Sequence, residues 1–251
     1  MSASLSGASN LPGRLIGVGV GPGDPELMTL KAVRALKEAD VVAFFCKQGN
    51  GSHARAIASG HFREGIEELI LGYPVTTESP KDEAPYKDAI AGFYEGAAKM
   101  VAGHLDAGRT VAVLSEGDPL FYGSYMHLHV RLSPHYPTEV IAGVTGMSGC
   151  WSQAGAPIAQ GDDVLAVLPG TLAEADLTRR LGEVDAAVIM KVGRNLPKIR
   201  RALAAAGKLE RALYVERGTM NGSRCERLAA RDESPAPYFA IVLVPGWGTN
   251  P

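Results

Sequence analysis

The sequence predicts an α/β protein of two domains, in which a mostly parallel sheet comes first and a mixed α+β sheet follows. Short apolar runs alternate with longer helical patterns in the first half, which is typical of parallel strands joined by crossover helices. After about residue 140 the candidate strands lie closer together, and the 30 glycines and 16 prolines stand at the joints between segments. Two prolines bracket a polar turn at 133–137, so we predict domains at 12–137 and 138–251.

The first domain begins with an apolar run that predicts a strand at 14–20. Asp24-Pro25 then predicts the start of a helix, because aspartate is a good N-cap and proline fits the first helical position. Its apolar face is formed by residues spaced three apart, namely Leu27, Leu30, Val33 and Leu36. Further strands are expected at 41–45 and 110–114, and further helices at 54–62 and 85–106.

The second domain is expected to hold more strands than helices. Its apolar runs predict strands at 139–141, 163–168, 186–191, 213–216 and 238–244. Helical patterns cover only 172–181 and 196–206. Two helices are too few to connect all of these strands in parallel, so this half is predicted as a mixed sheet.

Composition excludes several classes of protein. Lys plus Arg is 25 and Asp plus Glu is 27, a formal net charge of -2, without the basic excess typical of duplex nucleic-acid binding. No apolar run reaches membrane-spanning length, and the start lacks the pattern of a signal peptide. Three scattered cysteines argue against a disulfide framework and against a zinc site. We therefore expect a cytoplasmic protein without metal, nucleic acid or membrane as partners.

The densest glycine cluster, 17–23, follows the first strand, but it does not fit a dinucleotide site. The pattern G-x-G-x-x-G fails at Pro22 in one register and at Asp24 in the other. Cys46 and Lys47 stand at the end of the second strand, where a ribose-binding acid belongs. No G-K-[ST] is present, which also excludes a phosphate-binding P-loop.

Two other turns of small residues also follow strands. Gly117-Asp118-Pro119 repeats the Gly-Asp-Pro of the first turn, and a third turn spans 142–149. Helix capping alone explains any one of them. In a parallel sheet, however, the two Gly-Asp-Pro turns lie at the carboxyl edge, where α/β proteins bind ligands, and we expect the three turns to line one cleft.

These segments resemble the tetrapyrrole methylase family over nearly the whole chain, from 13 to 246. The markers are Val18–Thr29, Glu116–Pro119, Gly143–Thr145 and Val188–Lys191, whose order and spacing are specific. The resemblance implies use of S-adenosylmethionine, a cofactor cleft between two α/β domains, a tetrapyrrole substrate and a homodimer.

The resemblance also assigns roles to individual residues. The cofactor positions are Gly21, Pro22, Gly117, Asp118, Phe121, Thr145, Gly146, Met190, Thr219, Met220, Ile241 and Val242. The substrate's carboxylates need cationic partners, for which we select Lys47, His53, Lys191 and Arg194, whereas Arg55 has the pattern of a solvated surface charge. The methylated carbon must lose a proton, and the candidate catalytic residues are Asp118, Tyr122 and His127, with Glu116 also conceivable.

Two further stretches, 121–132 and 214–220, resemble the branch of the family that methylates precorrin-2 at C20 in cobalamin biosynthesis. Within the family, a cobalt-containing substrate of the anaerobic route, another ring position or diphthine remain alternatives. From other classes, a nicotinamide-dependent oxidoreductase or a non-catalytic ligand-binding protein remain alternatives.

Overall fold

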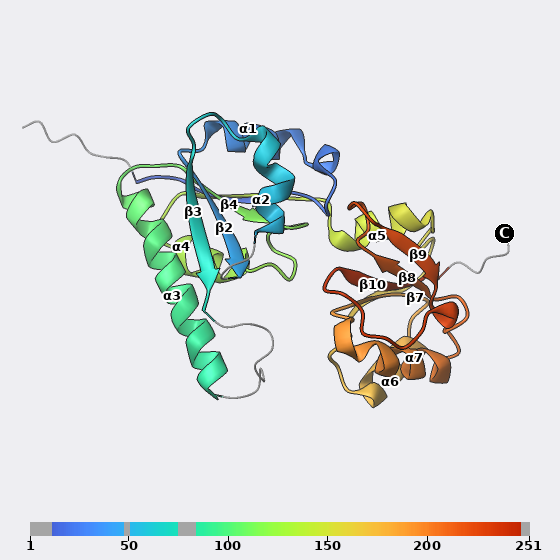
Figure 1. The fold of residues 1–251 in the computed structure, drawn as a ribbon. Helices are drawn as coiled ribbons and strands as arrows, with labels where there is room; N and C mark the ends of the chain where they lie inside the picture. Colours follow the sequence, from blue (N-terminus) through green and yellow to red (C-terminus); the bar gives the residue numbers. More distant parts are fainter. Residues whose placement is uncertain (1–11, 48–50, 75–83, 247–251) are drawn as a thin grey trace, which may run out of the picture. The chain divides into compact units, whose positions relative to one another are not determined.

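The computed structural model describes residues 12–47, 51–74 and 84–246, which form two compact units. The first unit ends at Thr145 and the second begins at Gly146. Each contains one five-stranded sheet, so the predicted succession of two α/β domains is confirmed (Figure 1). The division falls later than the predicted boundary at 137, because the strand at 138–141 pairs with the first strand and so belongs to the first sheet.

The sheet of the first unit is parallel throughout. Its strands are β1 (Leu15–Gly19), β2 (Val41–Lys47), β3 (Glu67–Tyr73), β4 (Val111–Ser115) and β5 (Thr138–Ile141), in the order β3-β2-β4-β1-β5. Every pairing between neighbouring strands is parallel. All five strands therefore end at one edge, which we call the carboxyl edge.

Helices cover both faces of this sheet. α1 (Leu30–Glu38), α2 (His53–Ala58) and the short η2 (Ser59–His61) pack on one face, with Val42 and Phe44 of β2. α3 (Ala84–Asp106) and α4 (Tyr125–Leu132) pack on the other, with Val41 and Ala43. Successive β2 residues alternate between the two hydrophobic clusters, as expected of a strand buried on both sides.

The helix predicted from Asp24 is divided in two. Asp24 Oδ1 accepts the Glu26 N–H at 2.9 Å and caps a single 3-10 turn, η1 (Pro25–Leu27). Thr29 is extended and its hydroxyl starts α1 afresh by accepting the Ala32 N–H at 3.1 Å. The predicted apolar face is right at Leu36, which is buried, and at Val33, which packs against the same cluster. It is wrong at Leu30, which is 84% exposed, and it omits the buried Ala32 and Ala35. A spacing of three residues rotates steadily around a helix and cannot stay on one face.

The second unit contains the mixed sheet. Its strands are β6 (Leu165–Pro169), β7 (Ala186–Met190), β8 (Leu213–Glu216), β9 (Arg224–Arg227) and β10 (Ala240–Val244), in the order β6-β7-β10-β8-β9. β6 and β7 are parallel, whereas β10 is antiparallel to both β7 and β8. β6, β7 and β8 therefore end at the same edge, where β10 begins.

Helices also cover both faces of the second sheet. α6 (Glu174–Gly182) and α7 (Leu196–Ala205), with the short η3 (Gly193–Asn195) and η4 (Leu228–Ala230), lie on one side. α5 (Gly146–Ala154) packs on the other through Cys150, against Val215 and Ile241. The strands β3 and β9, the helices α4 and α5 and the short 3-10 turns η3 and η4 are absent from the sequence-based prediction.

Candidate functional site

The turns after β1 and β4 are joined by backbone hydrogen bonds at the carboxyl edge of the first sheet. The Val20 N–H donates to the Ser115 carbonyl at 2.9 Å, and the Gly117 N–H donates to the Gly21 carbonyl at 2.8 Å. Gly21 has φ +81 and Gly117 has φ 65, a left-handed conformation that glycine adopts without steric cost. The two turns thus continue the contact between their strands beyond the sheet.

The turn after β5 lies in direct backbone contact with both. A Cβ on Gly19 would lie 2.6 Å from the Gly143 Cα and 2.7 Å from the Gly117 carbonyl oxygen. A Cβ on Gly143 would lie only 2.0 Å from that oxygen. The three turns of small residues that the sequence singles out therefore lie together, and they approach so closely that a side chain at Gly19 or Gly143 has no room.

Asp118 ties two of these turns. Its Oδ1 accepts the Leu120 N–H at 2.9 Å within its own turn, and its Oδ2 accepts the Gly143 N–H at 3.1 Å across to the next. Both carboxylate oxygens are thus engaged by backbone donors. Asp118 therefore holds the two turns together. This geometry gives no support to its predicted role as proton acceptor.

The other candidate proton acceptors differ in their surroundings. Glu116 accepts a backbone hydrogen bond from Ala54 on the α2 face, and burial raises its pKa. Tyr122 is 50% exposed, has φ 55 and meets Phe121 edge to face. His127 stacks on Tyr94 with 3.9 Å between ring centroids, and its pKa is lowered by partial burial and by Arg131. Both effects favour the neutral imidazole, which is the form that accepts a proton.

The predicted basic residues of the first unit lie on opposite faces of its sheet. Lys47 ends β2 and pairs with Tyr73 of β3, on the face covered by α3 and α4. His53 begins α2 on the other face, where it lies close enough to Glu116 to interact electrostatically. Arg55 is bound by Glu68, with 2.8 Å between Nη2 and Oε1, which agrees with its surface interpretation.

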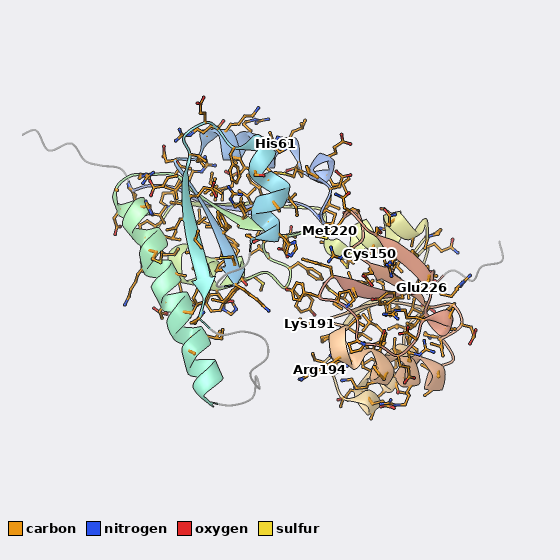
Figure 2. The ribbon with its side chains drawn as sticks, viewed as in Figure 1. His61, Cys150, Lys191, Arg194, Met220 and Glu226 are labelled. Carbon is orange, nitrogen blue, oxygen red and sulfur yellow. The ribbon has the colours of Figure 1, made fainter. Side chains whose placement is uncertain are left out.

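In the second unit, the predicted site residues gather around the ends of β7 and β8. Met190 ends β7, and Lys191 and Arg194 are exposed beyond it, on the same side of the unit (Figure 2). Lys191, Arg217 and Thr219 have φ 57, 52 and 66, which costs non-glycine residues energy and is common at functional sites. Arg217 was not selected from the sequence, because only the structure reveals its backbone conformation.

The remaining predicted cofactor residues lie at α5 and β10. Thr145 ends the first unit, and Gly146 begins α5, where a Cβ would lie 3.9 Å from the Ile241 Cδ1. Val242 is fully buried on the opposite face, in the cluster formed with α6 and α7. Ile241 is therefore the β10 side chain next to α5, and Val242 offers no side-chain surface to a ligand.

Within residues 12–47, 51–74 and 84–246, no three His, Cys, Asp or Glu side chains lie close enough together to hold a metal ion. No helix in the same ranges is both long and apolar enough to cross a membrane.

The chain matches known proteins over most of its length. Residues 14–232 match the family model of the tetrapyrrole (corrin/porphyrin) methylases. The precorrin-2 C(20)-methyltransferase of Sinorhizobium sp is 64% identical over 239 residues, which are 95% of this chain and 98% of that protein. The cobalt-precorrin-2 C(20)-methyltransferase of Salmonella typhimurium is 29% identical, over 92% of this chain and 96% of that protein.

A solved structure shares the fold. The uroporphyrin-III C-methyl transferase of Thermus thermophilus, in complex with S-adenosyl homocysteine, has a TM-score of 0.64 and 27% identity, over 93% of this chain and 97% of that chain. Sequence and fold thus agree over both units. The chain belongs to the tetrapyrrole methylase family.

Proposed function

We propose that this chain transfers the methyl group of S-adenosylmethionine to C20 of precorrin-2 in cobalamin biosynthesis. The observation that carries the proposal is the 64% identity to a precorrin-2 C(20)-methyltransferase along almost the full length of both chains. The relative named for a cobalt-containing substrate is 29% identical, which favours the metal-free substrate. No observation favours a nicotinamide-dependent reaction.

The residues at the strand ends have the chemistry to hold S-adenosylmethionine. The joined turns around Gly21, Gly117 and Gly143 present peptide groups without side chains, which suits close approach by a nucleoside. Half-buried Met190 and Met220 supply apolar, polarizable surface for an adenine ring. The cleft between the units remains a prediction, as do the individual contacts.

Bound S-adenosylmethionine supplies a methyl group that is already electrophilic because it is attached to a positively charged sulfur. The protein's task is then to align this methyl group with the nucleophilic carbon and to exclude water. Positioning of this kind contributes roughly 7–11 kcal/mol in favourable cases. A site built mainly from rigid backbone turns suits such a reaction.

One proton must be removed after methyl transfer. The new carbon–carbon bond forms at C20 as the carbon–sulfur bond breaks, and C20 then releases its hydrogen as a proton. We assign this proton to the neutral imidazole of His127, because Asp118 is engaged by two backbone donors and Glu116 faces α2. Lys47, His53, Lys191 and Arg194 remain the proposed partners of the substrate's carboxylates. The homodimer, the cytoplasmic location and the absence of a resident metal remain predictions.

The test is incorporation of a labelled methyl group. The protein is incubated with ¹³C-methyl S-adenosylmethionine and either precorrin-2 or its cobalt complex, and the products are analysed by NMR. We expect label at C20 and faster turnover of the metal-free substrate. Label at another carbon, or no label in the macrocycle, would refute the proposal.

A further inference from the structure

A cluster of ring side chains lies at the carboxyl edge of the first sheet, on the face covered by α3 and α4. We call it the aromatic wall, and it consists of Phe45, Tyr73, Phe93, Tyr94 and His127. Ring centroids lie 5.8 Å apart for Phe45 and Tyr73, 4.7 Å for Tyr73 and Phe93, 5.1 Å for Phe93 and Tyr94, and 3.9 Å for Tyr94 and His127. α3 continues past the ends of β2 and β3 and extends this side of the edge (Figure 1).

The hydroxyl groups of Tyr73 and Tyr94 share one hydrogen-bonding partner, the Ser124 hydroxyl. The Tyr73 hydroxyl is hydrogen-bonded to the Ser124 Oγ, and the Tyr94 hydroxyl donates to the same oxygen at 3.4 Å. Ser124 immediately precedes α4 and closes the loop that begins at Gly117 and Asp118. The wall is therefore fixed to the loop that carries one of the three glycine turns.

The aromatic wall contains more polar groups than packing alone requires. Leucine or phenylalanine would fill the same space without hydroxyl or imidazole groups, whose burial costs free energy unless they are satisfied. Tyr94 is buried, whereas Phe45, Tyr73 and Phe93 are only half-buried, so ring surface remains accessible. Lys47 pairs in register with Tyr73 and projects to the same face of the sheet, which adds a positive charge beside the rings.

Aromatic faces, hydrogen-bonding groups and an adjacent cation together match a flat, conjugated molecule with acidic groups at its rim. We propose that the aromatic wall is the surface against which the tetrapyrrole ring lies, with Tyr73 and Phe93 contacting it and Ser124 as the positioning residue that holds Tyr73. This inference rests on the proposed function, because it takes the substrate class from it.

The test measures tetrapyrrole binding without turnover. Uroporphyrin III, an octacarboxylate porphyrin, is titrated into the full-length protein and followed by its visible absorbance, and S-adenosylhomocysteine is titrated in parallel by calorimetry. The variants are Tyr73→Phe, which keeps the ring, and Phe93→Leu, which removes a ring at similar volume. Tyr136→Phe is the matched control, because its hydroxyl binds Asp106, the last residue of α3, at 2.7 Å and lies away from the carboxyl edge.

We expect Tyr73→Phe and Phe93→Leu each to raise the Kd for uroporphyrin III about three- to tenfold. Tyr73→Phe releases the Tyr73 ring from Ser124, and Phe93→Leu removes one aromatic contact with the porphyrin. The control variant and the Kd for S-adenosylhomocysteine should stay within twofold of wild type. Unchanged porphyrin affinity in both variants, an equal loss of S-adenosylhomocysteine affinity, or no porphyrin binding by the wild type would each overturn the inference. If the proposed function itself is wrong, the wild-type protein transfers no methyl group in the labelling experiment, so the two failures can be told apart.

Discussion

At the scale of single residues, the site is organised by backbone contacts, and the Asp118 side chain connects two of the turns. Its carboxylate bridges the turn after β4 to the turn after β5. The interpretation of Gly-Asp-Pro as plain helix capping fails here, because no helix begins until Tyr125. The same three letters after β1 do cap a 3-10 turn.

We predict that Asp118→Ala weakens S-adenosylhomocysteine binding about tenfold and lowers the free energy of unfolding by about 1–2 kcal/mol, because two backbone N–H groups lose their acceptor. Calorimetry and urea unfolding measure the two effects. Asp232→Ala is the control, since Asp232 accepts the Ser234 N–H at 2.9 Å in an exposed turn of the second unit. Unchanged cofactor affinity in Asp118→Ala would contradict the bracing role.

Gly143 is predicted to tolerate no side chain. A Cβ would lie 2.0 Å from the Gly117 oxygen, so Gly143→Ala must separate the turns. We expect a loss of about 1–3 kcal/mol in the free energy of unfolding, as for other overpacked sites, together with weaker S-adenosylhomocysteine binding. Gly182→Ala, at the end of α6 with open space around it, should leave both quantities nearly unchanged. Equal behaviour of the two variants would show that the turns are not in contact.

The burial of Glu116 can be tested by the pH dependence of the free energy of unfolding. Burial raises its pKa, so the folded state holds its proton more tightly than the unfolded state does. The stability that Glu116 contributes by binding this proton is therefore fully present below the ordinary pKa of 4.5. It is lost as pH rises through the raised value. In urea unfolding measured at a series of pH values, Glu116→Gln should therefore gain stability relative to wild type as pH rises from 4.5 through the raised value, and the difference should stay constant above it.

In urea unfolding at the same series of pH values, Glu174→Gln should show the opposite trend and lose stability relative to wild type as pH rises. The hydrogen bond from Arg201 lowers the pKa of Glu174, so its stabilising contribution is present above 4.5 and lost as pH falls. A Glu116→Gln curve that runs parallel to wild type at every pH would mean that this carboxyl is not buried in solution.

At the scale of elements, most strands and long helices are predictable because their apolar runs are buried in a sheet or along one helix face. The predicted helix at 85–106 is α3, and Ala97, Val101 and Leu105 are buried as expected. The missed strands β3 and β9 lie at sheet edges, where β9 is exposed along its whole length and Ile70 of β3 is 58% exposed. These two strands bury too little apolar surface to leave a clear pattern in the sequence, whereas the edge strands β5 and β6 keep apolar runs that predict them.

α5 was missed for a different reason. Gly146 and Gly149, together with serine at 148, give it poor intrinsic helix propensity, and the sequence was interpreted as a turn. Packing against Val215 and Ile241 stabilises the helix despite that propensity. The aromatic wall was also unpredictable, because Tyr73 and Ser124 lie 51 positions apart and no local pattern connects them.

α4 is held on the sheet by Tyr125, whose ring lies directly over Gly17 of β1. A Cβ on Gly17 would lie 2.4 Å from that ring. The Tyr125 hydroxyl is hydrogen-bonded to the His129 Nδ1 at 3.2 Å, and burial raises its pKa to about 12. Tyr125→Phe should therefore cost about 1 kcal/mol in urea unfolding. Wild-type stability in this variant would show that the hydroxyl does not help to dock α4.

At the scale of the whole molecule, the predicted cofactor residues come from both units. Those of the first lie in the turns after β1, β4 and β5, and those of the second lie at α5, in β10 and around the ends of β7 and β8. One ligand that contacts both sets should protect both from solvent exchange. We propose that S-adenosylmethionine contacts both sets, since the proposed chemistry depends on where it is held.

Hydrogen exchange of the intact protein, with and without saturating S-adenosylhomocysteine, tests this claim most directly. We expect slower exchange of amides at 19–24, 115–124 and 142–146 in the first unit and at 190–193 and 217–220 in the second. Segments 106–110 and 133–137, at the opposite edge of the first sheet, serve as internal controls and should not change. Protection confined to one unit, or protection of the control segments instead, would contradict the account.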